Sequence, residues 1–135
     1  MSEAKNIATA TADIAETRYT CTLRTGEHSL LADEPAPEGA DAGPSPFGLV
    51  LSGLGACTAI TLRMYAERKS WPLERVHVRL AYRWIDREHP HIDREITLSG
   101  ALDDEQRARL AEIVEKTPVT RALRNGIAID TRFTH

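Results

Sequence analysis

The side chain most able to do chemistry is Cys57, which ends the small-residue run Ser52-Gly53-Leu54-Gly55-Ala56-Cys57 and is followed by Thr58. A thiol becomes a nucleophile when it loses its proton, which a nearby positive charge or hydrogen-bond donor favours. Two glycines precede this cysteine, although each glycine inside a helix costs about 1 kcal/mol relative to alanine. The run therefore indicates either a site or a helix that crosses another backbone closely. On local grounds, a small buried apolar residue is the commoner interpretation of Cys57.

Other polar clusters favour structural interpretations. His89-Pro90-His91 lies in an expected turn with no third ligand near it, so a solvated turn is favoured over a metal site. Arg75, Arg79 and Arg83 share one face of an expected strand. Pairing with acidic residues of the next strand is favoured over a role as a substrate clamp. The sequence contains no phosphate-binding loop, dinucleotide fingerprint or CxxC pair.

Length and charge narrow the classes of function. A chain of 135 residues fits one domain with a real core. The net charge of -3 and the absence of a basic stripe argue against nucleic acid as a partner. No apolar run is expected to reach membrane-spanning length, so no membrane partner is expected. The two cysteines and the lack of a signal-peptide pattern favour free thiols in the cytoplasm.

Short-range patterns predict the elements before Cys57. Residues Arg18 to Arg24 alternate as a half-buried strand, and a turn leads into a second strand over His28 to Ala32. Residues 1–17 are interpreted as a flexible arm or short edge element, and residues 18–135 as a single domain. The Pro- and acid-rich stretch 33–46 is expected to be a surface loop, of a length that is more often functional than idle.

The helix that carries Cys57 is expected to begin at Pro46, with Ser45 as N-cap, and to reach about Lys69. Its first half is apolar or small on nearly every side, which predicts burial in the centre of the fold or against a partner chain. Cys57 lies too far into this helix for the N-terminal dipole to help it. An activating cation must come from another segment, for example Arg18 or Arg24, or from a second subunit.

The remaining pattern is strand, strand, helix, helix, strand. Two strands cover residues 75–85 and 91–100, and Arg94 interrupts the inward face of the second, which indicates that this end is close to solvent. A capping box predicts a helix from residue 103 to Lys116, and Thr117-Pro118 begins a short helix that Asn125-Gly126 closes. A last strand is expected over residues 127–133. Adjacent strand pairs predict antiparallel hairpins and an α+β fold class.

Several motifs together resemble the OsmC/Ohr family. They are Gly43-Pro44-Ser45-Pro46, the run from Leu49 to Thr58, Leu62-Arg63-Met64-Tyr65-Ala66, Trp71-Pro72-Leu73, Leu31-Ala32-Asp33-Glu34-Pro35 and the later run from Thr117 to Leu123. The resemblance extends from about the first hairpin to the last strand. It implies an OsmC-like fold, with antiparallel sheets around a central buried helix and an intertwined homodimer whose two sites lie at the subunit interface.

The resemblance also implies thiol-dependent reduction of hydroperoxides. Cys57 matches the family's peroxidatic cysteine, which is oxidised to a sulfenic acid and then forms a disulfide with a second cysteine. In this sequence the second position is Thr117, which cannot form a disulfide. Cys21 is the only other thiol, and it lies in a strand where the family does not place its resolving cysteine. A glutamate common in the family near the start of the cysteine helix is also missing, and Phe47 and Gly48 occupy that neighbourhood.

Two hypotheses follow. The first is a one-cysteine thiol peroxidase in oxidative stress defence, with Cys57 as the peroxidatic thiol and Arg24 or Arg18 as weak candidates for the activating cation. It would need no cofactor beyond an external thiol or dithiol reductant. The second is an OsmC-like protein without peroxidase activity, which binds a small apolar molecule or a partner at the dimer cleft. The missing second cysteine and the apolar Phe47 favour this alternative.

Overall fold

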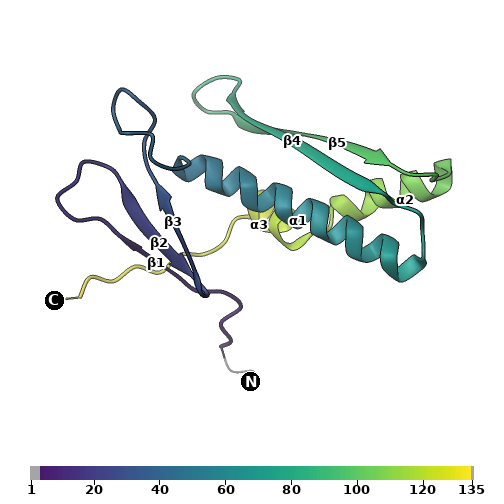
Figure 1. Cartoon of the computed structure of the whole chain (residues 1–135), viewed down its shortest axis with the longest axis horizontal. Helices are drawn as coiled ribbons and strands as arrows, with labels where there is room; N and C mark the ends of the chain where they lie inside the picture. The colour runs from purple at the N-terminus through teal and green to yellow at the C-terminus, as the bar shows by residue number, and fades with distance from the viewer. Residues whose placement is uncertain (1–3, 135) are drawn as a thin grey trace. The chain divides into compact units, whose positions relative to one another are not determined.

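The computed structural model describes residues 4–134, which form two compact units, one up to Val50 and one from Leu51 onward (Figure 1). The elements run in the order β1 (Ala10–Asp13), β2 (Cys21–Thr25), β3 (His28–Ala32), α1 (Pro46–Lys69), β4 (Arg75–Trp84), β5 (Pro90–Ser99), α2 (Asp104–Val114) and α3 (Pro118–Asn125). All strand pairs are antiparallel. The predicted α+β class with antiparallel sheets and a long helix is confirmed.

The first unit is built on a three-stranded sheet in the order β1-β2-β3. The expected hairpin joins β2 to β3 through Gly26, whose φ of 58° lies in the left-handed region that glycine adopts at little cost. β1 lies within the stretch for which an arm or a short edge element is expected, and it pairs with β2 from Ala10 to Asp13. The predicted domain boundary after residue 17 stays a prediction.

The loop that follows β3 is ordered by the buried side chain of Asp33, which is 2% exposed. Its carboxylate accepts hydrogen bonds from the Thr20 hydroxyl at 2.9 Å and from the backbone N–H groups of Glu34 at 2.8 Å and Ala42 at 3.2 Å. Its own N–H donates to the Pro44 carbonyl at 3.1 Å. One carboxylate therefore closes the loop immediately before α1.

Helix α1 begins and ends where its sequence predicts. The Ser45 hydroxyl accepts from the Gly48 N–H at 3.1 Å, as an N-cap does. The helix ends at Lys69, after which Ser70 adopts a positive φ of 56°. Only one stripe of the helix is buried within the chain: Leu54, Thr58, Leu62 and Ala66. The opposite face is exposed, with Ile60 at 58%, so burial on every side is wrong for the single chain.

The composition of α1 also corrects an expectation about membranes. The helix contains an 18-residue window with a mean hydropathy of 1.5, long and apolar enough by length and composition alone to cross a bilayer. The expectation that no apolar run approaches this length is therefore wrong. The core helix of a water-soluble protein meets the same criterion.

In the core of the second unit, α1 and α2 pack against the β4–β5 hairpin. Its buried residues are Leu62, Ala66, Leu73, Leu110 and Val114. Val76 of β4 and Ile96 of β5 pack against them, which confirms that the inward-facing alternation of these strands points to the core. Full burial of one leucine side chain stabilises a fold by about 1.5–3 kcal/mol. The cluster thus anchors α1, α2 and the hairpin as one body.

The two short helices begin with the predicted signals. The Asp103 carboxylate accepts from the Gln106 N–H at 2.8 Å, and the Gln106 side chain accepts from the Asp103 N–H at 3.0 Å, which completes the capping box of α2. Thr117 is the N-cap residue of α3, with Pro118 next to it. Gly126 ends α3 with a φ of 77°.

The strand expected over residues 127–133 is not formed. These residues pair with no strand among residues 4–134, and their alternating apolar side chains are open to solvent: Ile127, Ile129 and Phe133. An isolated strand leaves its backbone donors and acceptors unpaired, so the alternation alone does not form one. The sequence pattern is that of a strand, but no strand among the described residues pairs with it.

Candidate active site around Cys57 and Arg94

Cys57 lies in the second unit, near the middle of α1. Its side chain is partly buried and its thiol is free, as is that of Cys21 in β2. Cys57 immediately precedes Thr58, which is on the buried stripe of the helix and is fully buried. The cysteine therefore borders the packed side of α1 and still reaches the surface, which is the exposure that a reacting thiol needs.

One of the two glycines before Cys57 has a packing explanation. A Cβ on Gly55 would lie 2.9 Å from Leu80 Cδ1, so this residue lets β4 approach the helix closely. A Cβ on Gly53 would meet nothing within 4 Å. Close packing inside the chain thus accounts for Gly55 and leaves Gly53 on the open face.

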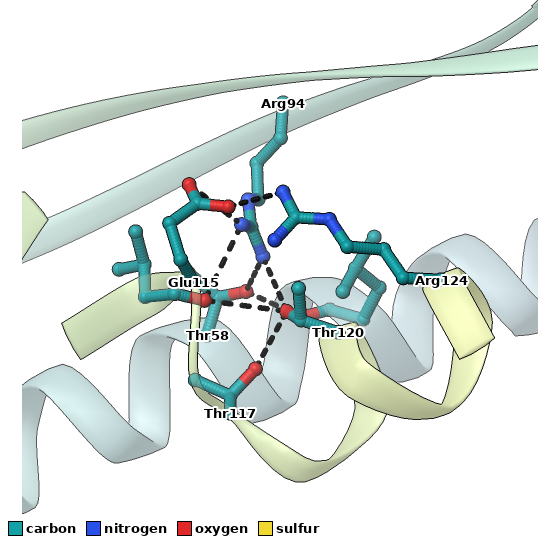
Figure 2. Close-up of polar contacts among 8 residues, drawn as sticks. Thr58, Arg94, Glu115, Thr117, Thr120 and Arg124 are labelled. Atoms are coloured by element: carbon teal, nitrogen blue, oxygen red, sulfur yellow. Dashed lines mark hydrogen bonds and ion pairs between the residues drawn. The ribbon is translucent and has the colours of Figure 1, made fainter. Parts of the chain in front are cut away.

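A buried arginine, Arg94 of β5, is the centre of a polar cluster beside this part of the helix (Figure 2). Its side chain is 10% exposed. Its Nη1 donates to the Thr58 hydroxyl at 3.0 Å and to the Thr120 hydroxyl at 2.8 Å. Its Nη2 donates to the Val114 carbonyl at 3.3 Å. One guanidinium thus joins β5, α1, the end of α2 and the first turn of α3.

The threonine hydroxyls of the cluster have fixed roles. Thr58 donates its single proton to the Leu54 carbonyl at 2.7 Å, so towards Arg94 it acts as acceptor. Thr120 donates to the Val114 carbonyl at 3.3 Å, so it accepts from Arg94. The Thr117 and Thr120 oxygens are 2.6 Å apart, and because the Thr120 proton is already used, Thr117 is the donor of that bond.

Thr117 occupies the position that the family resemblance assigns to the second cysteine. It is the N-cap residue of α3 by position and 1% exposed, but its side chain makes no capping hydrogen bond. Its hydroxyl bonds Thr120 instead. In this chain the position is therefore part of a buried hydrogen-bond network.

The charges of the cluster do not balance. The Glu115 carboxylate lies 3.5 Å from Arg94 Nη2 and also forms an ion pair with Arg124, whose side chain is more exposed. Two guanidinium groups thus share one carboxylate, which leaves one positive charge in excess. Three hydroxyl and carbonyl oxygens supply the other acceptors, and within residues 4–134 no buried side-chain nitrogen or oxygen lacks a hydrogen-bond partner.

Sequence reasoning missed the role of Arg94. The expectation that this end of the strand is close to solvent does not hold at Arg94, since nine-tenths of its side chain is buried and its guanidinium finds acceptors on three other segments. The available signal was its position between Ile92 and Ile96 on the inward face of the strand. A charged residue on a buried face is rare unless it is paired.

Arg18 and Arg24 belong to the first unit, and the side chains of both are exposed. Arg24 is in β2, opposite Ser29 of β3 and Thr11 of β1. Their proposed roles as activating cations stay predictions. The structure does bring Thr117, Thr120 and Arg94 together with Thr58, the neighbour of Cys57.

The other polar groups singled out in the sequence form local pairs. His89 lies 2.6 Å from Asp86 in the turn between β4 and β5, and His91 lies 3.1 Å from Asp93, both of them in β5. Arg83 pairs with Asp93 at 2.5 Å, which confirms cross-strand pairing for this arginine. Within residues 4–134, no group of three His, Cys, Asp or Glu side chains is placed to hold a metal ion.

Comparison with known proteins identifies the class. The family model described as OsmC-like protein matches residues 39–132. An OsmC-like protein from Mycoplasma pneumoniae has a TM-score of 0.76 at 17% identity, with 91% of each chain covered. The organic hydroperoxide resistance protein OhrB of Bacillus subtilis has a TM-score of 0.61 at 20% identity, covering 90% of this chain and 93% of that one.

A further structure, from Vibrio cholerae, has captopril bound in one of its active sites and a TM-score of 0.62 at 18% identity, covering 93% of this chain and 90% of that one. At these identities the structural likeness shows the fold alone. No curated protein matches the chain. The long cysteine-bearing helix and the antiparallel hairpins define an OsmC-like α+β fold. Because the family model covers most of the sequence, the chain belongs to the OsmC-like protein family.

Proposed function

We propose that this protein is a one-cysteine thiol peroxidase, which reduces hydroperoxides through Cys57. The observation that carries the proposal is the free, partly exposed thiol of Cys57 near the middle of α1, next to Thr58, to which the Arg94 guanidinium donates a hydrogen bond. Membership of a family that includes organic hydroperoxide resistance proteins supports the same chemistry. No resident cofactor takes part in the proposed cycle.

In the first step the Cys57 thiolate attacks the terminal oxygen of the hydroperoxide and the O–O bond breaks. The sulfur becomes a sulfenic acid, and the alkoxide that leaves takes up a proton to give the alcohol. The peroxide is thereby reduced by two electrons and the sulfur is oxidised by two. Arg18 or Arg24, from this chain or a second copy, is the proposed cation that favours the thiolate.

In the second step an external thiol condenses with the sulfenic acid, forming a mixed disulfide and releasing water. A second equivalent of thiol then releases Cys57 and leaves as the disulfide. Thr117 cannot take the place of this reductant, because a hydroxyl does not form a disulfide. The hydroxyl is also committed to Thr120 in the buried network.

The test is to trap the sulfenic acid. In a Cys21→Ser background, low concentrations of tert-butyl hydroperoxide should produce a dimedone adduct on Cys57, detected by mass spectrometry, and Cys57→Ser should give none. The second-order rate of oxidation should exceed that of free N-acetylcysteine. A rate no greater than that of the free thiol would rule out the proposed peroxidase function.

A second variant tests the geometry of the site. If position 117 keeps the place that the family gives its second cysteine, Thr117→Cys should form a disulfide with Cys57 under mild oxidant. Non-reducing peptide mapping would show it, with Thr117→Ser as the matched control. Both thiols still free after oxidation would argue against that geometry.

A second candidate function is binding of a small apolar molecule at the dimer cleft, without peroxidase activity. It is favoured by Phe47, which is partly exposed in the neighbourhood where the family commonly has a glutamate. The structure from Vibrio cholerae, with captopril in one of its active sites, shows that one member of this fold holds a small molecule there. Slow oxidation of Cys57 together with ligand-induced thermal stabilisation would favour this candidate.

We also propose that two copies assemble as a homodimer in the cytoplasm. The exposed face of α1 carries Ile60 and Met64, and the segment after α3 exposes Ile129 at 84%. Contiguous exposed apolar surface marks interaction sites. A second copy would cover the helix face and offer the unpaired segment a strand to pair with.

A further inference from the structure

The cluster around Arg94 reaches the turn of α1 that ends beside Cys57. Thr58 follows Cys57 directly, and its hydroxyl both donates to the Leu54 carbonyl and accepts from Arg94 Nη1. A threonine bonded back to the carbonyl four residues earlier bends a helix slightly, and here the arginine fixes the orientation of that hydroxyl. Arg94 is thus bonded to the residue that follows Cys57, in the same turn of the helix.

The same guanidinium fixes the first turn of α3. Arg94 Nη1 also donates to Thr120, and Thr120 accepts from Thr117. The start of α3 is therefore joined to the turn of α1 through one nitrogen atom (Figure 2). Thr117, at the position of the family's second cysteine, and Thr58, which follows Cys57, therefore belong to one hydrogen-bond network.

Burial makes this arrangement demanding. A guanidinium that is nine-tenths buried must keep its acceptors, because leaving a buried charge without them is strongly destabilising. Arginine is suited to the place, since its planar fork donates in several fixed directions, whereas a lysine ammonium acts as a compact point charge. Loss of a single acceptor should therefore shift the whole network.

We propose that Arg94 is a positioning residue for Cys57, acting through Thr58 and Thr120. The kinetic part of this inference rests on the proposed peroxidase function. The positioning itself does not, because alkylation also reports how the Cys57 thiol is presented to a reagent. Arg94 itself takes no part in bond making.

The experiment uses the full chain with Cys21→Ser, so that Cys57 is the only thiol. Thr120→Val removes the hydroxyl at nearly constant shape and leaves Thr117 without its acceptor, whereas Thr120→Ser keeps the hydroxyl. Arg94→Lys keeps the charge and loses the fork. Arg79→Met, an exposed arginine on the neighbouring strand β4, is the matched control.

Alkylation by iodoacetamide and oxidation by tert-butyl hydroperoxide are followed for each variant, with thermal unfolding as a check of folding. Thr120→Val and Arg94→Lys should change both rates of Cys57 by about tenfold, which is within the roughly hundredfold effect that a misplacement of about 1 Å can have on a reacting group. Thr120→Ser and Arg79→Met should stay close to the parent rates.

Unchanged alkylation in folded Thr120→Val would overturn the proposal, as would equal effects of the Val and Ser variants. If Arg94→Lys does not fold, the Val and Ser pair at position 120 decides. If Cys57 of the parent protein is alkylated normally but is oxidised no faster than free N-acetylcysteine, only the proposed peroxidase function is ruled out. The alkylation comparison would still test the positioning.

Discussion

At the scale of single residues, the buried charged groups Arg94 and Asp33 have different kinds of partner. Arg94 shares a carboxylate and uses neutral oxygens, whereas Asp33 is held by hydroxyl and backbone donors. Burial by itself raises the pKa of Asp33. The hydrogen bonds from Ala42, Thr20, Glu34 and Ala40 together outweigh it, so the pKa of Asp33 lies below its ordinary value of 3.8.

This lowered pKa predicts that the free energy of unfolding decreases at acidic pH. A group whose folded pKa is lowered contributes stability above its unfolded pKa and loses it as the pH falls through the folded pKa. The contribution of Asp33 should therefore be complete above 3.8 and decline at more acidic pH. Asp33→Asn should lower the melting temperature at neutral pH and flatten the acid branch of melting temperature against pH.

Thermal unfolding followed by circular dichroism from neutral to acidic pH measures this effect. Asp41→Asn is the matched control, because Asp41 is an exposed carboxylate of the same loop with a left-handed backbone that asparagine tolerates. Identical acid branches for Asp33→Asn and the parent would show that Asp33 does not supply the linkage.

At the scale of elements, the two faces of α1 have different environments. Its buried stripe packs in the core of the second unit, and its opposite face keeps Gly53 in open space. A glycine that nothing in its own chain requires is consistent with another backbone approaching that face, which is what the proposed homodimer supplies. Gly53 and Gly55 of this helix therefore have different structural explanations.

The variant Gly53→Leu distinguishes the stability of the single chain from the affinity of the proposed dimer. Within one chain the new side chain has room and should stabilise the helix by about 1 kcal/mol, because leucine has a higher helix propensity than glycine. In the dimer it should clash and raise the dissociation constant. Analytical ultracentrifugation measures the constant, with Lys69→Leu at the exposed end of α1 as control. A dimer unaffected by Gly53→Leu would place the interface elsewhere.

Sequence reasoning predicted those elements whose signals are local. The Asp103 capping box, the Ser45 cap and the turn at Gly26 each depend on residues a few positions apart, and all three are confirmed. The cluster around Arg94 could not be predicted in this way. Its bonds to Thr58 and Thr120 join residues 36 and 26 positions away, and no local pattern encodes those distances.

At the scale of the whole molecule, one segment has the sequence pattern of a strand but forms no strand in the single chain. The segment 127–133 alternates apolar and polar residues, yet its apolar side chains are exposed and its backbone is unpaired among residues 4–134. Periodicity predicts which side chains share a face, but whether a strand forms also depends on an available sheet edge. For this segment we propose the edge of a second copy.

Replacing Ile127, Ile129 and Phe133 by serine should therefore weaken the dimer and leave the fold of each chain intact. Each side chain that a partner covers contributes roughly 1.5–3 kcal/mol of burial, so the dissociation constant should rise by at least about tenfold. Size-exclusion chromatography with light scattering measures the assembly, and circular dichroism monitors the fold. A dimer of undiminished affinity would contradict the proposed role of this segment.

The two tryptophans give the molecule a pair of internal optical reporters. Trp71 packs edge-to-face on Tyr65, with ring centroids 5.5 Å apart, and contacts the hydrophobic core. Trp84 is 59% exposed near the tip of the hairpin and donates to the Tyr82 hydroxyl. Iodide should quench the emission of the outer indole far more than that of the inner one. The fluorescence of one chain therefore contains two separable signals. Trp71 reports on the core, and Trp84 reports on contacts near the tip of the hairpin.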